Sequence, residues 1–322
     1  MTVASLYGPV QADLSNVETT LAEVKSTDFP ALSRMLEHVL GGAGKRMRPA
    51  LALLAGRYQD YNLEQLVPLA ASVELLHTAT LVHDDVIDVA ATRRGRATAN
   101  SLYDNAASVM LGDFMFAHAA DLVARTGNLR VIRLFSRTLM RIATGELDQD
   151  VSAFDWSKGV RDYFSRIGGK TASLFATACE GGAIISGAPE SWIEALRDYG
   201  YNLGVAFQIV DDILDFTGNE GEMGKPVGSD LMQGTLTLPA LLLMEGKPHD
   251  NAIKRLFQAR RLRERRLAEA VEAVRNSDGL QRSRAMAQEF AGRARTALEP
   301  LPHDEVSGTL MHLIGYVLDR QS

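Results

Sequence analysis

The 322-residue sequence predicts an all-α fold. Long segments repeat apolar residues at steps of three and four, which is the spacing of one helix face. Short runs that alternate β-branched and polar residues between hairpin dipeptides are nearly absent, so strands are not expected to form the core. Four segments follow the helical pattern most clearly: Leu66 to Val86, Val109 to Val123, Val131 to Leu147 and Leu196 to Phe216.

The segments between these helices are rich in glycine, proline and small polar residues, which favour turns. They lie at Gly41–Pro49, Thr92–Arg96, Ser186–Pro189 and Gly218–Gly228. No linker of low complexity divides the chain, and no short repeat is visible. The sequence therefore predicts one domain over residues 1–322.

Composition narrows the classes of protein that fit. Apolar residues make up 46% of the chain and charged residues 23%, which is ordinary for a soluble globular protein. With 34 basic against 40 acidic residues the net charge is −6, so nucleic acid is not an expected partner. The single cysteine, Cys179, fits a reducing compartment. The first residues lack the pattern of a secretory signal, and no uninterrupted apolar run approaches the ~18 residues of a membrane span, so we expect a cytoplasmic protein.

Two aspartate-rich clusters of the same form are the most informative motifs: DDVID at Asp84–Asp88 and DDILD at Asp211–Asp215. Each follows a long apolar stretch and is expected on a helix. Positions i and i+4 of a helix lie within about 40° of each other, so the first and last aspartates of each cluster project from one face. Such carboxylates are hard ligands for Mg²⁺, which combines a few of them with phosphate oxygens. Two faces of this kind predict a magnesium site for an anion such as diphosphate.

Basic residues accompany the first cluster. His77 lies two helical turns before Asp84, so it is expected to share that helix face and to donate a hydrogen bond to phosphate. Arg93 and Arg94 follow on a glycine-ended loop, where planar guanidinium groups can bind phosphate in bidentate fashion. A core histidine and a solvated helix end are the structural alternatives for these residues.

A glycine-rich segment, Gly41–Pro49, carries the cations Lys45, Arg46 and Arg48. It lacks the GxxxxGK[ST] pattern of a P-loop because Arg46 follows Lys45, and no strand precedes it. The segment predicts an anion pocket of a different kind.

Polar residues also surround the second cluster. Gly168-Gly169-Lys170-Thr171 places a lysine and a hydroxyl group at an expected helix entrance. Gln208 lies three residues before Asp211 and shares its helix face, and Lys225 follows on the next loop. Each of these residues alone is typical of solvated surface, and only their grouping around carboxylates indicates a site.

Together these motifs resemble those of the trans-isoprenyl diphosphate synthases, the polyprenyl synthetase family, over most of the chain. The similar segments are GKRMRP (Gly44–Pro49), HTATLVHDDVID (His77–Asp88), RRG (Arg93–Gly95), GKT (Gly169–Thr171), FQIVDDILD (Phe207–Asp215) and TLP (Thr237–Pro239). The resemblance implies an all-α isoprenoid-synthase bundle around a deep central cavity, usually a homodimer. It also implies a prenyltransferase that joins isopentenyl diphosphate to an allylic diphosphate, head to tail and in trans geometry.

The resemblance also assigns roles to the matching residues. The magnesium ligands, for two or three ions per site, would be Asp84, Asp88 and Asp211, which with Arg93 and Lys170 form the catalytic set. The allylic diphosphate would contact Arg93, Lys170, Thr171, Gln208 and Lys225. Isopentenyl diphosphate would contact Lys45, Arg48, His77 and Arg94. Asp85 and Asp215 would hold cations or metal-bound waters, and Thr235 stands where many relatives carry lysine.

The chemistry of this reaction suits these residue types. Neutralising the leaving diphosphate lets the allylic C–O bond ionise. The isopentenyl double bond then attacks the carbocation, and proton loss gives a longer chain. No side-chain base of suitable type stands out, and the resemblance implies that the released diphosphate accepts the proton. Apolar walls would keep water from the cation.

Product length is expected to depend on the helix before the first cluster. In the family that the chain resembles, a bulky aromatic residue there gives short products. This chain instead has Leu76, Ala79 and Thr80, with no Phe, Tyr or Trp from Asn62 to Asp88. The sequence favours a long-chain product of the heptaprenyl, octaprenyl or solanesyl type, suited to quinone side chains. A farnesyl or geranylgeranyl diphosphate synthase is the alternative, because more distant aromatic residues could close the tunnel.

Other functions fit less well. A phosphohydrolase would need histidine ligands beyond His83, a di-iron bundle would need a second Glu74-x-x-His77 pattern, and a terpene cyclase would lack the DDILD cluster. A regulatory subunit of a heteromeric synthase would be expected to lose aspartates or cations that this chain keeps. The stretch Lys254–Arg266 holds mostly basic residues, which fits a solvated helix face or a transient contact with an anionic membrane surface.

Overall fold

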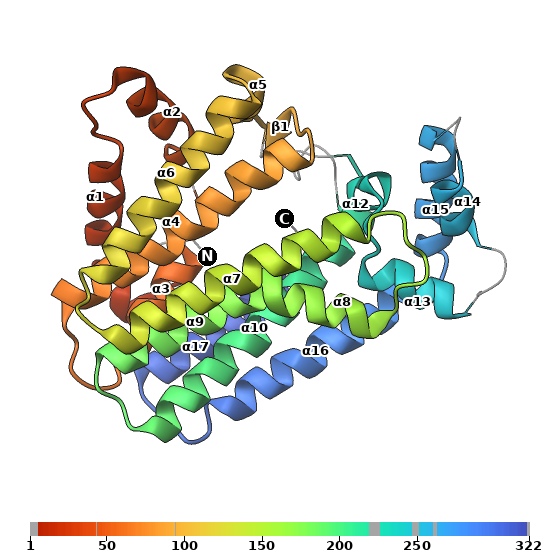
Figure 1. Cartoon of the computed structure of the whole chain (residues 1–322). Helices are drawn as coiled ribbons and strands as arrows, with labels where there is room; N and C mark the ends of the chain where they lie inside the picture. The colour runs from red at the N-terminus through yellow and green to blue at the C-terminus, as the bar shows by residue number, and fades with distance from the viewer. Residues whose placement is uncertain are drawn as a thin grey trace. The chain divides into compact units, whose positions relative to one another are not determined.

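The structure is a computed structural model that describes residues 6–42, 44–93, 95–218, 226–246, 251–259 and 263–320. Helices make up most of these residues, and the strands among them form one short antiparallel hairpin, β1 (Thr92–Arg93) with β2 (Arg96–Ala97). The all-α prediction is therefore confirmed (Figure 1).

Each of the four helices predicted from periodicity is present and slightly longer than predicted. They are α4 (Leu63–Ile87), α6 (Asn105–Ala124), α7 (Leu129–Val151) and α10 (Glu190–Thr217). Polar N-terminal caps explain why α4 and α6 begin before their predicted first residues. The Asn62 side chain accepts a hydrogen bond from the Glu64 N–H at 3.0 Å, and the Asp104 side chain accepts one from the Ala107 N–H at 2.7 Å. Such caps satisfy N–H groups that have no partner within the helix.

The chain forms two compact units, and each is assembled from segments far apart in the sequence. Unit 1 contains Met1–Leu139, Leu174–Tyr201 and Ala294–Ile314. Unit 2 contains Met140–Ser173, Asn202–Arg293 and Gly315–Ser322. The helices α7 and α10 each contribute residues to both units. One domain over the whole chain stays a prediction.

Unit 1 is built on α4, whose buried residues recur at helical spacing. Leu66, Leu69, Val73 and Leu76 are fully buried. Helix α6 lies beside α4 (Figure 1). The other elements of unit 1 are the 3₁₀ helix Gly8–Val10, α1 (Leu14–Val24), α2 (Pro30–Leu40), α3 (Met47–Gly56), α5 (Ala99–Leu102), most of α9 (Ser173–Ile185) and part of α17 (Glu305–Leu318).

Two glycines let helices of unit 1 approach each other closely. A Cβ atom on Gly182 of α9 would lie 2.2 Å from the carbonyl oxygen of Ala52 in α3. A Cβ atom on Gly112 of α6 would lie 2.1 Å from Nε2 of His83 on α4. Both distances are shorter than van der Waals contact. A larger residue at Gly182 would push against the α3 backbone, whereas one at Gly112 would displace the His83 side chain.

Unit 2 has its own apolar core, in which Phe216, Leu238, Ile253 and Val274 are fully buried. Besides parts of α7, α10 and α17, its elements are α8 (Val160–Ile167), the π-helical turn Gly168–Ala172, α12 (Ser229–Gln233), α13 (Leu238–Gly246), α14 (Ala252–Phe257), α15 (Arg263–Arg275) and most of α16 (Gly279–Ala297).

By length and hydropathy, α4 and α6 could each cross a membrane. In α4, however, 61% of the apolar window is buried inside the protein, and the helix carries the acidic residues Glu74, Asp84 and Asp85. We therefore interpret α4 as a core helix. In α6, 39% of the window is buried, and Val109 and Met110 are exposed. Helix α6 thus presents apolar surface.

We expect Gly182→Ala to destabilise the protein by about 1–3 kcal/mol, because the new methyl group would collide with the α3 backbone. Gly308→Ala is the matched control. Gly308 lies in α17 with no atom within 4 Å of an added Cβ, so alanine should stabilise the protein by about 0.5–1 kcal/mol. Urea unfolding measures both changes. Equal effects of the two substitutions would show that the crossing of α9 and α3 does not need glycine.

Candidate active site

The first aspartate cluster lies at the end of α4 in unit 1. The backbone N–H of Asp88 donates to the carbonyl oxygen of Asp84 at 2.8 Å, so these residues lie one helical turn apart. Asp84 is 9% exposed, and Asp88 is half-buried. The helix thus places the two carboxylates on one face, as its period requires.

Asp85 is rotated by about 100° from that face and binds a cation. Its Oδ1 accepts a hydrogen bond from Arg93 Nε at 2.7 Å. The chain reverses after α4, where Val89 has a left-handed conformation (φ 52°), and this reversal lets Arg93 on β1 reach back. Burial raises the pKa of Asp85 above its ordinary value, while the charge and hydrogen bond of Arg93 oppose that shift. Arg94 lies outside the described residues.

The glycine-rich loop enters α3 through Arg46, which has a left-handed backbone (φ 48°, ψ 32°). The Arg46 guanidinium group donates hydrogen bonds to Glu18 of α1 and to Glu74 of α4. The Tyr7 hydroxyl donates a hydrogen bond to the carbonyl oxygen of Lys45. Burial alone would lower the pKa of Arg46, but the hydrogen bonds and charges of the two glutamates outweigh it and raise that pKa above its ordinary value.

The other cations of unit 1 have different surroundings. The guanidinium carbon of Arg48 lies 4.6 Å from the ring centroid of Phe175, and Lys45 is exposed. His77 is half-buried on α4, one turn after Glu74. The described candidates for binding isopentenyl diphosphate thus lie on two segments of unit 1: Lys45 and Arg48 on the glycine-rich segment, and His77 on α4.

The residues expected to set product length do not share one environment. Leu76 and Ala79 are fully buried in unit 1. Thr80 is half-buried, and its hydroxyl donates to the carbonyl oxygen of His77 at 2.7 Å. Because Thr80 lies one turn before Asp84, it is the residue of the three that shares the face of the first cluster.

The second cluster lies near the end of α10 in unit 2. Asp211 Oδ1 is 3.0 Å from Nη1 of Arg320, whose guanidinium carbon is also 4.2 Å from the ring centroid of Phe207. Asp215 is fully buried and accepts a hydrogen bond from the Ser229 hydroxyl at 2.9 Å. Asp215 thereby connects α10 to α12, which begins at Ser229.

Asp212 is the centre of a hydrogen-bond chain in unit 2. The Tyr163 hydroxyl donates to its Oδ2 at 2.6 Å, and Gln208 Nε2 donates to its Oδ1 at 2.8 Å. The Thr171 hydroxyl donates to Gln208 Oε1 at 2.8 Å, so two predicted allylic contacts are brought together. Burial raises the pKa of Asp212 to about 7, and Asp230 acts in the same direction, while the hydrogen bonds from Tyr163 and Gln208 partly oppose the shift.

Lys170 lies in a π-helical turn, so the interpretation of its segment as a helix entrance is wrong. The turn Gly168–Ala172 joins α8 to α9 without a break. Close backbone contact explains two glycines: a Cβ on Gly145 would lie 3.2 Å from the Lys170 nitrogen, and one on Gly169 would lie 3.2 Å from a carbonyl oxygen of α7. Lys170 Nζ forms an ion pair with Glu146 Oε2 at 2.5 Å.

Sequence reasoning missed several residues that contact the predicted site, namely Glu146, Tyr163, Asp212 and Arg320. Only Asp212 could have been found from the sequence, because its place next to Asp211 turns it toward the packed side of the helix.

Lys225 lies outside the described residues. Thr235 donates its backbone N–H to the carbonyl oxygen of Asp230 at 2.8 Å.

The carboxylates fit a hard divalent cation such as Mg²⁺. Asp84 and Asp88 offer a pair of carboxylates on α4 of unit 1, and Asp211 on α10 of unit 2 is paired with Arg320. Within the described parts of the chain, no three His, Cys, Asp or Glu side chains are grouped as a metal cluster. A pair of carboxylates suits an ion that completes its shell with water and phosphate oxygens.

Two alternative sites do not match the geometry. His83 Nε2 is 3.0 Å from the carbonyl oxygen of Val109, and its ring packs against Phe116, so His83 faces α6. Glu74, the glutamate of the di-iron pattern, is bound to Arg46.

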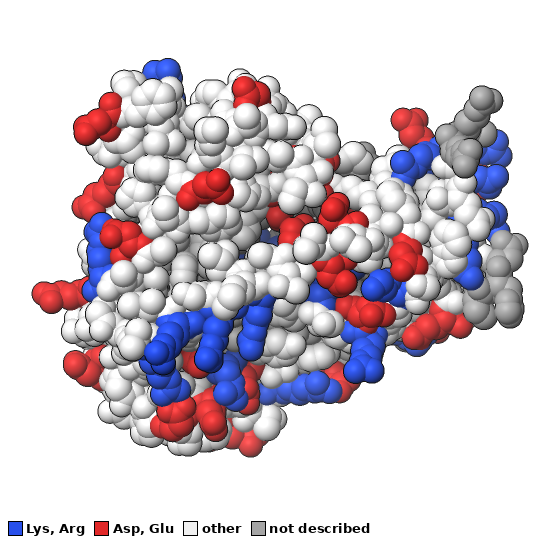
Figure 2. Space-filling model, in the orientation of Figure 1, with Lys and Arg blue, Asp and Glu red and all other residues white. Residues whose placement is uncertain are grey.

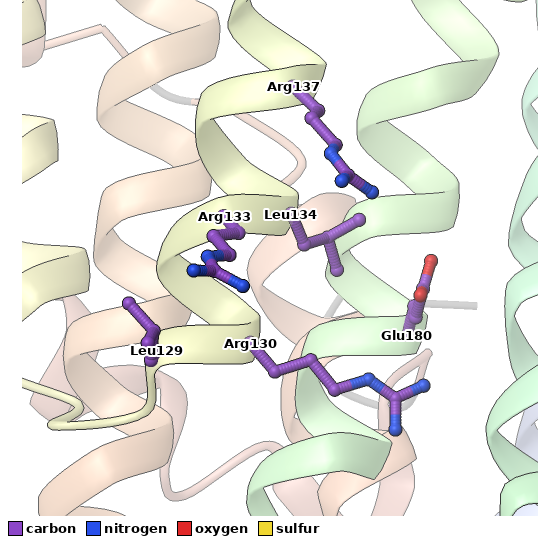
Figure 3. A pocket seen from close by; sticks show the side chains of 6 residues that line it. All are labelled: Leu129, Arg130, Arg133, Leu134, Arg137 and Glu180. Atoms are coloured by element: carbon purple, nitrogen blue, oxygen red, sulfur yellow. The ribbon is translucent and has the colours of Figure 1, made fainter.

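A basic cavity of about 500 Å³ lies elsewhere in unit 1. Figure 2 shows basic side chains gathered along α7, and Figure 3 shows Arg130, Arg133 and Arg137 of this helix with Glu180 of α9. Arg130 also pairs with Glu190 at 2.5 Å. None of the predicted site residues lines this cavity.

Comparison with known proteins agrees with these motifs. Residues 29–274 match the family model described as polyprenyl synthetase. Heptaprenyl diphosphate synthase component 2 of Geobacillus stearothermophilus is 37% identical over 317 residues, which cover 98% of each chain. Octaprenyl diphosphate synthase of Haemophilus influenzae is 35% identical and covers 99% of this chain and 98% of its own. The crystal structure of a polyprenyl synthase from Caulobacter crescentus, complexed with calcium and isoprenyl diphosphate, matches with a TM-score of 0.94 at 34% identity, covering 100% of this chain and 98% of that chain.

The buried carboxyl group of Asp212 should make stability depend on pH. Its pKa is about 7 in the folded protein against an ordinary value of 3.8, so the folded state holds a proton that the unfolded chain releases. That contribution is present at low pH and is lost as the pH rises through the folded value. Between about pH 4 and about pH 7, the thermal midpoint of the native protein should fall more steeply than that of Asp212→Asn. Calorimetry at several pH values measures this, and parallel curves would contradict it.

Proposed function

The chain belongs to the polyprenyl synthetase family of prenyltransferases, and on that premise we propose that it makes a long-chain all-trans-polyprenyl diphosphate. It would condense isopentenyl diphosphate with an allylic diphosphate repeatedly, head to tail. The observation that carries this proposal is the first cluster, where Asp84 and Asp88 share a helix face and Asp85 holds Arg93 beside them.

The residues of the two clusters would bind the allylic diphosphate. Mg²⁺, when bound, would help to neutralise the leaving diphosphate, and Asp84, Asp88 and Asp211 are its proposed ligands. Lys170 and Arg93 would add positive charge to the same group. Each of these cations is already oriented by a carboxylate, Glu146 or Asp85, so little reorganisation would be needed when the substrate binds.

The second substrate would be held by the cations of unit 1. Lys45, Arg48 and His77 are the described candidates for binding isopentenyl diphosphate, and Arg94 is a further candidate from sequence alone. The isopentenyl double bond would attack the allylic cation, and the released diphosphate would accept the proton. Thr171 and Gln208 are bonded to each other and would act as a pair on the allylic diphosphate.

A long product is supported by the composition of α4 and by the names of the relatives. The helix has no aromatic side chain along its length, so no bulky ring of its own limits the growing chain. The similar enzymes from Geobacillus and Haemophilus are named for heptaprenyl and octaprenyl products. A shorter farnesyl or geranylgeranyl product is the alternative, and a product assay distinguishes it from a long-chain product.

A homodimer in the cytoplasm is part of the proposal. Exposed apolar side chains on α6, such as Val109 and Met110, are surface that a second copy would cover. The Geobacillus relative is named as one component of its synthase, so a heteromeric assembly is the competing outcome. A transient membrane contact of the stretch Lys254–Arg266 stays a weaker proposal, because Arg265 and Arg266 already pair with Glu269.

Purified chain with Mg²⁺, labelled isopentenyl diphosphate and allylic primers of different lengths should give turnover without another protein. Asp84→Asn should lower kcat/KM on the order of a hundredfold. The Mg²⁺ ion that would neutralise the leaving diphosphate would lose one of its proposed ligands. Asp28→Asn is the control, since Asp28 is an exposed aspartate of unit 1 between α1 and α2. Turnover that appears only after a second protein is added would favour the regulatory-subunit alternative.

Aromatic residues before the first cluster should shorten the product. We expect Ala79→Tyr and Thr80→Tyr to shift the product distribution toward fewer isoprene units, because either ring would occupy space that the growing chain needs. Ala79 is fully buried, so its variant is expected to lose stability as well, whereas Thr80 is half-buried and its variant is expected to lose less. Chromatography of dephosphorylated products measures the shift. An unchanged product distribution in both variants would show that Ala79 and Thr80 do not line the space that limits product length.

A further inference from the structure

Arg46 is the middle cation of the glycine-rich loop, yet its side chain faces protein carboxylates. Nη1 lies 2.7 Å from Oε1 of Glu74, and Nε lies 2.5 Å from Oε1 of Glu18. The Arg46 side chain is only 17% exposed, whereas Lys45 before it is exposed. Two carboxylates hold its guanidinium group, whereas Arg93 and Lys170 each pair with one, so Arg46 is not expected to bind a diphosphate.

The backbone of Arg46 turns the loop into α3. A left-handed conformation is uncommon for a residue with a side chain, and it persists only where the surroundings hold it. The Arg46 carbonyl oxygen accepts a hydrogen bond from the Ala50 N–H at 3.1 Å, which closes the first turn of the helix. The Tyr7 hydroxyl holds the carbonyl oxygen of Lys45. The turn thus leaves Lys45 just before α3 and Arg48 in its first turn.

The ion pair with Glu74 connects this loop to the helix of His77. Glu74 is 6% exposed and lies one turn before His77 on α4. A buried carboxylate is costly unless it is paired, so Glu74 fixes the guanidinium group from α4 while Glu18 fixes it from α1. The loop, α1 and α4 therefore meet at Arg46.

We propose that Arg46 is a positioning residue for isopentenyl diphosphate: it clamps the loop of Lys45 and Arg48 to α4 at the turn before His77. This inference rests on the proposed function, since it concerns the second diphosphate site of the same reaction. Arg46 acts through its neighbours, because loss of the clamp would remove none of the proposed diphosphate-binding cations but would free the loop that carries two of them.

The informative variant is the double substitution Arg46→Gln with Glu74→Gln. Two amides can still form a hydrogen bond, and neither charge is left buried alone, so the fold is expected to persist with a thermal midpoint near that of the native protein. KM for isopentenyl diphosphate should rise on the order of tenfold, because displaced cations bind the substrate less well. KM for the allylic primer should stay within about twofold.

Single substitutions and a control complete the test. Arg46→Lys keeps the charge but loses the planar fork, so its KM for isopentenyl diphosphate should lie between those of the native protein and the double variant. Arg57→Gln is the matched control, because Arg57 also pairs with a carboxylate of unit 1, Asp13, and donates a further hydrogen bond to the carbonyl oxygen of Pro9. Both of its KM values should be unchanged.

Calorimetric titration with isopentenyl diphosphate alone gives a readout that does not depend on turnover. The double variant should bind it on the order of tenfold more weakly than the native protein. Unchanged binding and unchanged KM in a folded double variant would overturn the inference, as would equal rises in both KM values. A native protein that binds isopentenyl diphosphate but shows no turnover would refute the proposed function while leaving the role of Arg46 testable.

Discussion

Burying a carboxylate costs free energy unless a donor or a cation compensates it, and the candidate site is organised by that constraint. Glu74 is compensated by Arg46, and Asp85 by Arg93. In both cases the partner comes from another segment, the glycine-rich loop or β1. Neutralising the charge therefore also fixes how two segments meet, and the same contacts hold cations next to the residues proposed to bind diphosphate.

Local periodicity explains why much of the fold and the first cluster could be predicted. The spacing of apolar residues in α4 is a property of the helix itself, so it is visible in the sequence and persists in the structure. The same period puts Asp84 and Asp88 on one face without any knowledge of their neighbours. The two glycines before Lys170 suggested a break before a helix, but they lie inside a continuous helical run in which Gly169 approaches α7 closely.

Contacts between distant segments could not be predicted, because no regular sequence spacing connects two residues that meet from different helices. Tyr163 reaches Asp212 from α8, and Arg320 reaches Asp211 from the end of α17. The role of Arg46 was hidden for a related reason. Three cations in one loop look equivalent in a sequence, and only the positions of Glu18 and Glu74 show that Arg46 is the one held by two carboxylates.

In both clusters the second aspartate has a different environment from the first, and helix geometry explains the difference. In the pattern DDxxD the first and last aspartates lie on one face, but the second is turned about 100° toward the packed side of the helix. There it needs a partner: Asp85 has Arg93, and Asp212 has Tyr163 and Gln208. The second aspartate therefore orients polar groups beside the face that is proposed to bind metal, with a guanidinium group as its partner on α4 and neutral donors on α10. The last aspartates differ, because Asp88 is half-buried whereas Asp215 is fully buried and bound to Ser229. The shared pattern thus gives the same role on the two helices to its second aspartate, but not the same surroundings to its last.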